Sequence, residues 1–232
     1  MNIALGIIST LICFTAIVLI EKFFKKEGLF VWVAAATILA NIYLAKTVGL
    51  GPITASLGNI LFASNYLATD ILTEKYGGKS AKKAVVLGLC AAVIFIVSSQ
   101  IALAFIPDAS DTMQPVMESL FTIAARITAA SVTCYFLSNL LDVWMFEKIK
   151  KKTNGKYMWL RNNVSTIVSN CGENFVFYLL AFLGVMDLPI LLSLAATASV
   201  IEIAIALCDT PFLYLSKKLD KKTPALAEAS KE

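Results

Sequence analysis

The chain has 232 residues, of which 58% are hydrophobic and 16% are charged, with a mean hydropathy of +0.77 and a formal net charge of +4. Soluble domains are about 45–50% apolar and about 25% charged, so this composition excludes an ordinary soluble domain and indicates a membrane protein. The chain has no histidine, which also excludes a Ser-His-Asp triad and a zinc site of the HExxH type.

Apolar runs of membrane-spanning length follow one another along the chain. A helix needs about 20 apolar residues to cross a bilayer core of about 30 Å. The runs are residues 2–20, 29–46, 53–73, 84–106, 119–146, 163–186 and 190–215. They are continuous rather than alternating, which favours helices over a β-barrel. The sequence therefore predicts an all-α, polytopic membrane bundle with seven spans.

Basic residues fall on one side of this predicted bundle. If the helices alternate in direction, 18 of the 20 Lys and Arg lie on that side, in 21–27, 75–83, 148–161 and the residues after 214. The opposite loops, 107–118 and 187–189, carry only acidic charges. Because positively charged loops stay in the cytoplasm, we predict that the amino terminus lies outside and the carboxyl terminus inside.

The first two runs carry little chemistry. Run 2–20 lacks the basic start and the cleavage site of a signal peptide, and we interpret it as a peripheral span. Run 29–46 contains Asn41 and small residues suited to close helix packing. A tight outer turn is expected at 49–52. The five cysteines lie within apolar runs without CxxC pairing and are interpreted as small apolar side chains.

The third run carries the first polar face inside the membrane. Asn65, Thr69 and Thr73 are four residues apart and form one stripe, and Asp70 and Glu74 form a neighbouring one. Polar and acidic residues in membrane helices usually face a cavity, a partner or a substrate path. For the two acids, interfacial anchoring with ion pairs to nearby lysines is the structural alternative.

Run 119–146 contains one basic residue and, further along, an amide and an acid. Arg126 lies in its outer third, and Asn139 and Asp142 lie towards the inside. Arg126 and Asp142 are about 24 Å apart along a helix that rises about 1.5 Å per residue, so they cannot pair. Each therefore needs a partner on another helix or a ligand.

The last two runs place acids inside the membrane. Side chains share one face in each run: Asn170, Glu173 and Phe177 in the first, Glu202 and Asp209 in the second. A lone carboxylate at mid-membrane costs about 2.5–3.5 kcal/mol on insertion scales, so we interpret these acids as functional. An ion pair of Glu173 or Glu202 with Arg126 is the structural alternative.

Several chemistries have no sequence support. There is no Walker A or GxGxxG motif, so this chain is not an ATPase subunit by itself, and no cofactor or metal site is indicated. Intramembrane proteolysis by two aspartates is disfavoured because Asp70, Asp142 and Asp209 all lie near the cytoplasmic ends without a Gly-Asp signature. The basic loop at 147–163 is explained by topology and anionic lipid, and no nucleic-acid partner is expected.

What remains is a polar cavity lined by carboxylates, amides and one arginine. Such groups suit a flat, hydrogen-bonding heterocycle. A guanine-like edge offers two adjacent N–H donors that one carboxylate accepts together, while its carbonyl takes a donor from Asn or Arg. Tyr135, Phe177 or Tyr178 could stack on its face.

Four segments carry a resemblance to a known family. They are NYLATDILTEKYGGKSAKKA, ARITAASVTCYFLSNLLDVWMF, LRNNVSTIVSNCGENFVFYLLAF and CDTPFLYL, and together they span roughly residues 30–216. In this order they resemble the queuosine precursor transporters, also called the vitamin-uptake-like transporter family. The most specific is the D-x-x-x-E-x-Y-G pattern.

The resemblance implies an inner-membrane importer of 7-cyano-7-deazaguanine or 7-aminomethyl-7-deazaguanine, which feed tRNA queuosine modification. It implies a six-helix core at 29–216, an additional helix with its basic link at 1–28 and a polar tail at 217–232. The positions that match residues the family keeps are Asp70, Glu74, Arg126, Asp142 and Asp209. Glu173-Asn174 departs from the family's usual Asp-Thr, and Asn139 stands where Gln is common, which puts the preferred precursor in doubt.

These observations give one expectation and two alternatives. We expect a transporter whose site binds the base through Glu173, with Asn170, Asn139 and Asn65 orienting it and with Asn41 and Phe177 also part of the site. Arg126 would hold Glu202 or gate the outer side, and Asp142 and Asp209 would close the inner side. The alternatives are a substrate-binding subunit that docks on a separate ATPase module, as in energy-coupling-factor importers, and a scaffold that binds no small molecule. A homodimer in the bilayer stays open.

Overall fold

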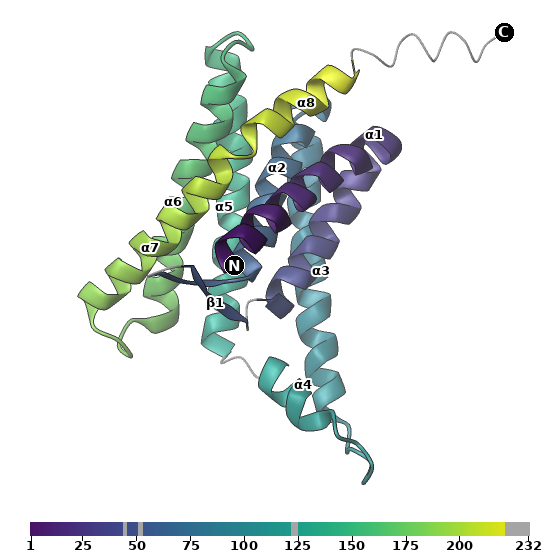
Figure 1. The fold of residues 1–232 in the computed structure, drawn as a ribbon, viewed down its shortest axis with the longest axis vertical. Helices are drawn as coiled ribbons and strands as arrows, with labels where there is room; N and C mark the ends of the chain where they lie inside the picture. The colour runs from purple at the N-terminus through teal and green to yellow at the C-terminus, as the bar shows by residue number, and fades with distance from the viewer. Residues whose placement is uncertain (44–45, 51–52, 122–124, 221–232) are drawn as a thin grey trace, which may run out of the picture.

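The structure, a computed structural model, describes the chain except residues 44–45, 51–52, 122–124 and 221–232; the side chains of 47, 50, 53–55, 125–129 and 220 are also not described. The elements are α1 (Asn2–Tyr43), β1 (Thr47–Leu50), β2 (Ile53–Ser56), α2 (Gly58–Tyr76), α3 (Gly78–Ala104), α4 (Gln114–Phe121), α5 (Ala125–Lys152), α6 (Met158–Phe182), α7 (Leu188–Leu207) and α8 (Thr210–Asp220). The long helices form one bundle, with α4 at one end (Figure 1).

α1 is a helical hairpin that contains the first two predicted spans. Lys25 has a non-helical backbone (φ 55°, ψ −141°), and the two halves of α1 run back alongside each other from there (Figure 1). The turn is tight at Gly28, where a Cβ would lie 2.5 Å from Ile20 Cγ2 and 3.0 Å from the Ile20 carbonyl oxygen. Glycine is therefore required where the second half leaves the turn.

A short β-hairpin departs from the all-α prediction. β1 and β2 pair antiparallel, with Thr47 opposite Ser56 and Leu50 opposite Ile53. Both strands contain β-branched residues, which favour extended backbone over helix. The predicted start of the third span at Ile53 is therefore wrong, and α2 begins at Gly58. The turn expected at 49–52 falls partly outside the described residues.

The predicted span 119–146 covers parts of two helices, α4 and α5, and residues 122–124 between them lie outside the described residues. α4 covers Gln114–Phe121, so helix begins within the stretch that the sequence assigned to an acidic loop. Pro115 suits this position, since the first turn of a helix does not need its N–H. Ser119 lies inside α4, so the predicted beginning of a helix at this residue is wrong. The long helix, α5, is described from Ala125 to Lys152.

The last predicted span is also interrupted. α7 ends at Leu207 and α8 starts at Thr210, leaving Asp209 at the junction. Pro211 has no N–H, and the amide of Phe212 instead begins the new helix by donating to the Asp209 carbonyl at 2.9 Å. The break presents the Asp209 side chain to the interior, where it is 1% exposed.

Membrane-spanning character is clearest at the outside of the bundle. Within the described chain, three helical stretches are long and apolar enough to cross a bilayer: α1, α3 and Leu188–Leu219, which contains α7 and α8. α2 is more polar, but its buried face holds most of that polarity, including Asn65, Thr69 and Asp70. The helical bundle is thus apolar towards its surroundings and polar within.

The hydrophobic core includes the first half of α1. Phe14 and Ile17 pack with Leu67, Ile71 and other buried side chains of α2, α3, α5 and α8. Many side chains nearer the amino terminus, by contrast, are exposed. The predicted span 2–20 was expected to be peripheral, but its later residues, including Phe14 and Ile17, pack into the core.

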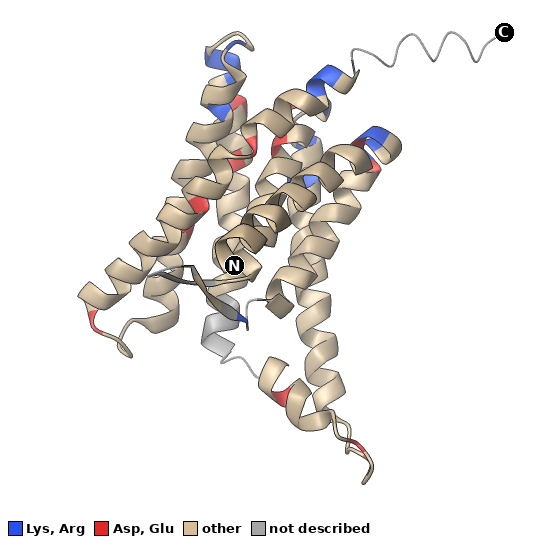
Figure 2. Ribbon diagram, in the orientation of Figure 1, with Lys and Arg blue, Asp and Glu red and all other residues tan. Residues whose placement is uncertain are grey.

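Charge is distributed unevenly along the bundle. Figure 2 shows Lys and Arg gathered at the end of the bundle that holds the α1 turn and the α5–α6 connection, with acidic residues in the interior and at the opposite end. This is the asymmetry that the sequence predicted for a bundle of alternating helices.

Candidate functional site

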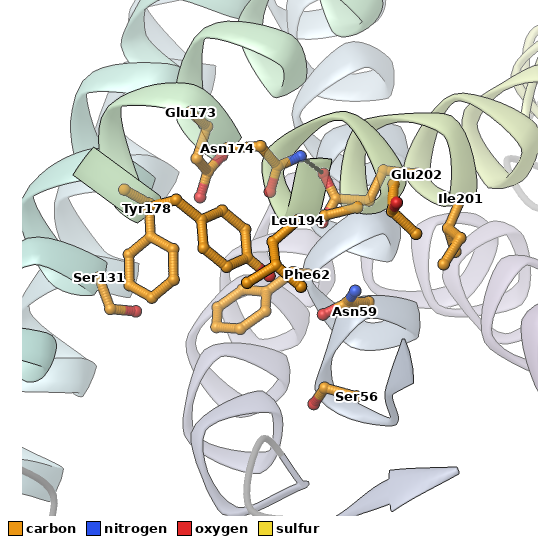
Figure 3. A pocket seen from close by; sticks show the side chains of 13 residues that line it. Ser56, Asn59, Phe62, Ser131, Glu173, Asn174, Tyr178, Leu194, Ile201 and Glu202 are labelled. Atoms are coloured by element: carbon orange, nitrogen blue, oxygen red, sulfur yellow. Dashed lines mark hydrogen bonds between the residues drawn. The ribbon is translucent and has the colours of Figure 1, made fainter. Parts of the chain in front are cut away.

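A pocket opens between α2, α5, α6 and α7, next to strand β2. Its volume is about 160 Å³. Its lining residues are Ser56, Asn59, Phe62, Ser131, Glu173, Asn174, Phe177, Tyr178, Leu194, Thr197, Ala198, Ile201 and Glu202 (Figure 3). Pockets for drug-sized ligands usually measure about 300–1,000 Å³, so this one suits a small molecule such as a single bicyclic base.

Glu173 is held at the pocket from behind by helix α2. The hydroxyl of Tyr66 donates to Glu173 Oε2 at 2.6 Å, and the same hydroxyl lies 2.6 Å from Ser138 Oγ on α5. Tyr66 is 3% exposed, so this anchor is shielded from water. One carboxylate oxygen is thus fixed, while the side chain still faces the pocket (Figure 3).

The second pocket carboxylate is fixed by an amide. Asn174 Nδ2 donates to Glu202 Oε2 at 2.8 Å, joining α6 to α7 (Figure 3). The sequence suggested Arg126 as the partner of Glu202, but the Arg126 side chain lies outside the described residues. Asn174 was not predicted as a site residue, although its place beside Glu173 was noted as a departure from the family pattern.

Aromatic rings form part of the pocket wall. Phe177 and Tyr178 pack edge to face with centroids 5.3 Å apart, and Phe62 lies 5.4 Å from Tyr135. Phe62 and Tyr178 both project towards the pocket in Figure 3. Tyr135 is 3% exposed and is not among the lining residues, and its hydroxyl accepts a hydrogen bond from Asn65 at 2.7 Å.

The predicted amides lie outside the pocket lining. Asn65 donates to Tyr135 and to Thr37, and Asn41 donates to the Thr37 carbonyl at 2.8 Å. Asn139 donates to the carbonyl of Tyr135 at 2.9 Å. Asn170 is 1% exposed, and within the described part of the chain neither atom of its amide has a hydrogen-bond partner. Of the predicted site residues whose side chains are described, only Glu173, Glu202 and Phe177 line this pocket.

A second group of acids lies buried between the helices. Asp70 and Asp142 are 0% exposed, and Asp209 is 1% exposed. Thr166 of α6 lies between the first two, 3.5 Å from Asp70 Oδ2 and 3.3 Å from Asp142 Oδ1. Asn162 of α6 donates to Asp209 Oδ1 at 2.6 Å. We call Asp70, Asp142 and Asp209 the aspartate cluster.

The basic end of the bundle is tied together by one carboxylate. Glu74 binds Arg161 at 2.7 Å, Lys150 at 3.0 Å and Lys217 at 2.6 Å, which joins α2, α5, α6 and α8. Burial raises the pKa of Glu74, but the bonds from Lys217, Lys150 and Arg161 outweigh it and hold the pKa below its ordinary value. We call this group the Glu74 node.

Sequence reasoning missed Arg161, which is 0% exposed. It was counted among the solvated charges of the α5–α6 connection. A signal was present, because Trp159 and Leu160 precede it and an apolar run begins two residues later. An arginine so close to a membrane helix needs an anion, and Glu74 supplies it.

Comparisons with known proteins agree with this architecture. The family described as "Putative vitamin uptake transporter" matches residues 56–216. A curated protein of Bacillus subtilis (strain 168) named "Probable queuosine precursor transporter" is 36% identical over 219 residues, or 94% of this chain and 96% of that protein. One of the same name from Haemophilus influenzae (strain ATCC 51907 / DSM 11121 / KW20 / Rd) is 29% identical over 128 residues, or 54% of this chain and 51% of that protein. No solved structure matches the chain.

Proposed function

This chain belongs to the vitamin uptake transporter family, and from that membership we propose that it imports a queuosine precursor of the 7-deazaguanine class. The family is one of transporters and not of enzymes. The Bacillus subtilis relative, similar over nearly the full length of both chains, supports a queuosine precursor as the substrate.

The observation that carries the proposal is the pair of carboxylates in one small pocket. Glu173 and Glu202 both line it, each already held through one oxygen by a neutral donor rather than by a cation. A 7-deazaguanine carries adjacent N–H donors on its pyrimidine ring and a further N–H on its pyrrole ring. Two carboxylates can therefore accept from both ends of the base.

The remaining pocket residues suit the rest of such a ligand. Asn59 and Asn174 offer amide donors for the ring carbonyl, and Phe62, Phe177 and Tyr178 offer aromatic faces or edges. We propose that Glu173 accepts the hydrogen bonds from the two adjacent N–H groups on the pyrimidine ring of the base. We choose Glu173 over Glu202 because its hydrogen bond from Tyr66 is the shorter of the two anchors, at 2.6 Å. Asn65, Asn139 and Asn170, which lie deeper, would then support the helices around the base rather than orient it in this conformation.

We propose seven spans in the cell's inner membrane, with the amino terminus outside and the carboxyl terminus inside. The basic end of the bundle would face the cytoplasm. The pocket is lined by Ser56 at the end of β2, so it lies towards the opposite, outer end. The conformation described is then one that receives substrate from outside. The division into 1–28, 29–216 and 217–232 stays part of this proposal.

Uptake measurements in cells test the assignment of Glu173. Glu173→Gln keeps the shape of the side chain but loses the charged acceptor, and loss of one charge-assisted contact costs about 1.5–3 kcal/mol, or roughly 10- to 150-fold in affinity. We expect uptake of labelled 7-cyano-7-deazaguanine and 7-aminomethyl-7-deazaguanine to fall accordingly, with unchanged protein level in the membrane. Glu118→Gln, on exposed α4, is the matched control and should transport normally. Normal uptake by Glu173→Gln would remove this residue from the site.

A further inference from the structure

The aspartate cluster lies outside the proposed substrate pocket, and its members have no ion-pair partner among the described residues. Within the described residues, Lys and Arg side chains pair with Glu21, Glu27 and Glu74, and none lies within ion-pair distance of the three aspartates. Carboxylates buried without a cation are strongly unfavourable as anions, and such groups tend to bind a proton instead.

The surroundings of Asp70 and Asp142 also favour a bound proton. Ionised carboxylates can only accept hydrogen bonds. Thr166 lies near both acids, but its hydroxyl has one hydrogen and can donate to only one of them. Among the described residues, no donor reaches Asp70 Oδ1 or Asp142 Oδ2. A proton bound by one of the two acids would remove one of these buried charges.

The neighbouring amide points to the same conclusion. Asn162 is 0% exposed and uses Nδ2 to bind Asp209, while its own Oδ1 and Asp209 Oδ2 have no hydrogen-bond partner among the described residues. A proton on Asp209 would remove a buried charge whose second oxygen has no donor. A divalent metal is a poorer fit, because no three acidic, histidine or cysteine side chains in the described part of the chain are grouped as metal ligands are.

The cluster is connected to the pocket by bonded side chains. Tyr66, which donates to Glu173, has its hydroxyl 2.6 Å from Ser138 Oγ, and Ser138 donates to the Ser169 carbonyl at 3.0 Å. The hydroxyl of Ser169 in turn lies 3.5 Å from Asp142 Oδ1. A change of charge on Asp142 therefore acts on the same turn of α6 that is tied to Tyr66 and, through it, to Glu173.

Other titratable groups lie on the elements that carry or pack against the cluster. They are Tyr66, Glu74 and Tyr76 on α2, Cys134, Tyr135, Glu147, Lys148, Lys150, Lys151 and Lys152 on α5, Arg161, Cys171, Glu173 and Tyr178 on α6, Glu202 on α7, Cys208 at the α7–α8 junction, Tyr214, Lys217 and Lys218 on α8, and the buried Glu21–Lys75 pair between α1 and α2.

We propose that Asp70, Asp142 and Asp209 form a proton-binding site that couples substrate import to proton entry. The proposal rests on the proposed function, since it needs a transported substrate. A proton from outside forms an O–H bond in the cluster, which removes the repulsion between carboxylates on α2, α5 and the α7–α8 junction and lets these elements close together. On the cytoplasmic side the O–H bond breaks, the proton leaves, and renewed repulsion opens that side.

Purified full-length protein in liposomes tests the coupling. If one proton enters with each substrate, a pH one unit lower outside than inside should support about tenfold accumulation of labelled 7-cyano-7-deazaguanine in the liposomes. A pH-sensitive dye trapped inside the liposomes should report acidification during uptake. Asp142→Asn and Asp70→Asn should abolish the effect of the gradient while exchange of internal for external substrate continues. Asp108→Asn, in the exposed outer loop, is the matched control and should behave as wild type.

The outcomes separate the two proposals. If wild-type protein exchanges substrate but a pH difference drives no accumulation, or a sodium gradient drives it instead, the proton site is overturned while the import function stands. If both aspartate variants keep full coupling, the cluster is not the site. If wild-type protein neither binds nor exchanges any 7-deazaguanine, the proposed function itself fails.

Discussion

Individual carboxylates inside this bundle lie in three distinct chemical settings. Glu21 is 0% exposed and pairs with Lys75 at 2.8 Å, and Glu74 serves three cations. Glu173 and Glu202 rely on neutral donors and face a pocket. The aspartate cluster has neither cations nor a full set of donors. Acids with cations stabilise the fold, whereas acids without them remain available to a ligand or a proton.

At the Glu74 node, Glu74→Gln should destabilise the protein at neutral pH. It leaves the buried guanidinium of Arg161 without its anion, and breaking such a pair is costly, although Lys150 and Lys217 are partly solvated. We expect a loss of about 2–3 kcal/mol, or roughly 4–12 °C in the thermal midpoint measured in detergent. Glu27→Gln, at an exposed position, should change the midpoint by less than about 1–2 °C.

The same variant has a defined pH dependence. The pKa of Glu74 is lower in the folded protein than the value of about 4.3 expected when unfolded. Its contribution to stability is therefore fully present above about pH 4.3 and is lost as pH falls through the lower folded pKa. Midpoints measured from pH 7 to pH 3 should show the difference between wild type and Glu74→Gln shrinking at the acid end. A constant difference would contradict the role of Glu74 as a charged partner.

Among the elements, the α1 hairpin is the one that joins the two ends of the chain. Its first half packs Phe14 against Phe212 of α8 with centroids 5.3 Å apart. Its turn region carries Glu21, which accepts from Tyr76 at the end of α2 and lies 3.3 Å from the Ser216 hydroxyl of α8. The amino-terminal helix is therefore fastened to α2 and α8 by both apolar and ionic contacts.

The closeness of the two halves of α1 predicts an unusual effect of alanine. Gly28→Ala would place Cβ against Ile20 and Phe24, and overpacking of this kind costs about 1–3 kcal/mol. Gly6→Ala in the same element meets no atom within 4 Å and should be neutral or stabilise by about 0.5–1 kcal/mol. Thermal unfolding of the two variants in detergent checks this contrast. Equal thermal midpoints for Gly28→Ala and Gly6→Ala would contradict the prediction, because the hairpin would then accommodate a Cβ at residue 28.

Across the whole molecule, polar groups follow one another from the pocket to the basic end. These polar groups lie among α2, α5, α6, α7 and α8: the pocket carboxylates, Tyr66 with Ser138, the aspartate cluster and the Glu74 node. Away from the basic end, by contrast, the exposed side chains of α1 and α3 are mostly apolar. Polar groups in lipid are costly, so helices that bury them against one another are expected to enclose a substrate route.

This arrangement predicts transport without an ATPase partner. Purified protein reconstituted alone in liposomes should take up labelled 7-aminomethyl-7-deazaguanine or 7-cyano-7-deazaguanine, because pocket, cluster and basic end belong to one chain. Binding without any uptake or exchange would instead favour a substrate-binding subunit that requires an energy-coupling module. Absence of binding in thermal-shift titrations would favour a scaffold. Liposomes that contain the Glu173→Gln variant give the background uptake against which the wild-type protein is compared.

The sequence by itself determined the helical, membrane-spanning character, the uneven charge and the family. These depend on composition, on runs of apolar residues and on short motifs, all of which are local. It also singled out Glu173, Glu202 and Phe177, because isolated acids and a neighbouring ring on an apolar helix stand out without any knowledge of contacts.

Only the tertiary structure decided which polar groups meet. Asn174, Tyr66 and Thr166 are ordinary in sequence and gain their roles from partners 24 to 107 residues away. The pairing of Arg161 with Glu74, 87 residues apart, likewise depends on contacts between segments. Local patterns report which face of a helix is polar, whereas the partner of each polar group is set by how the helices pack.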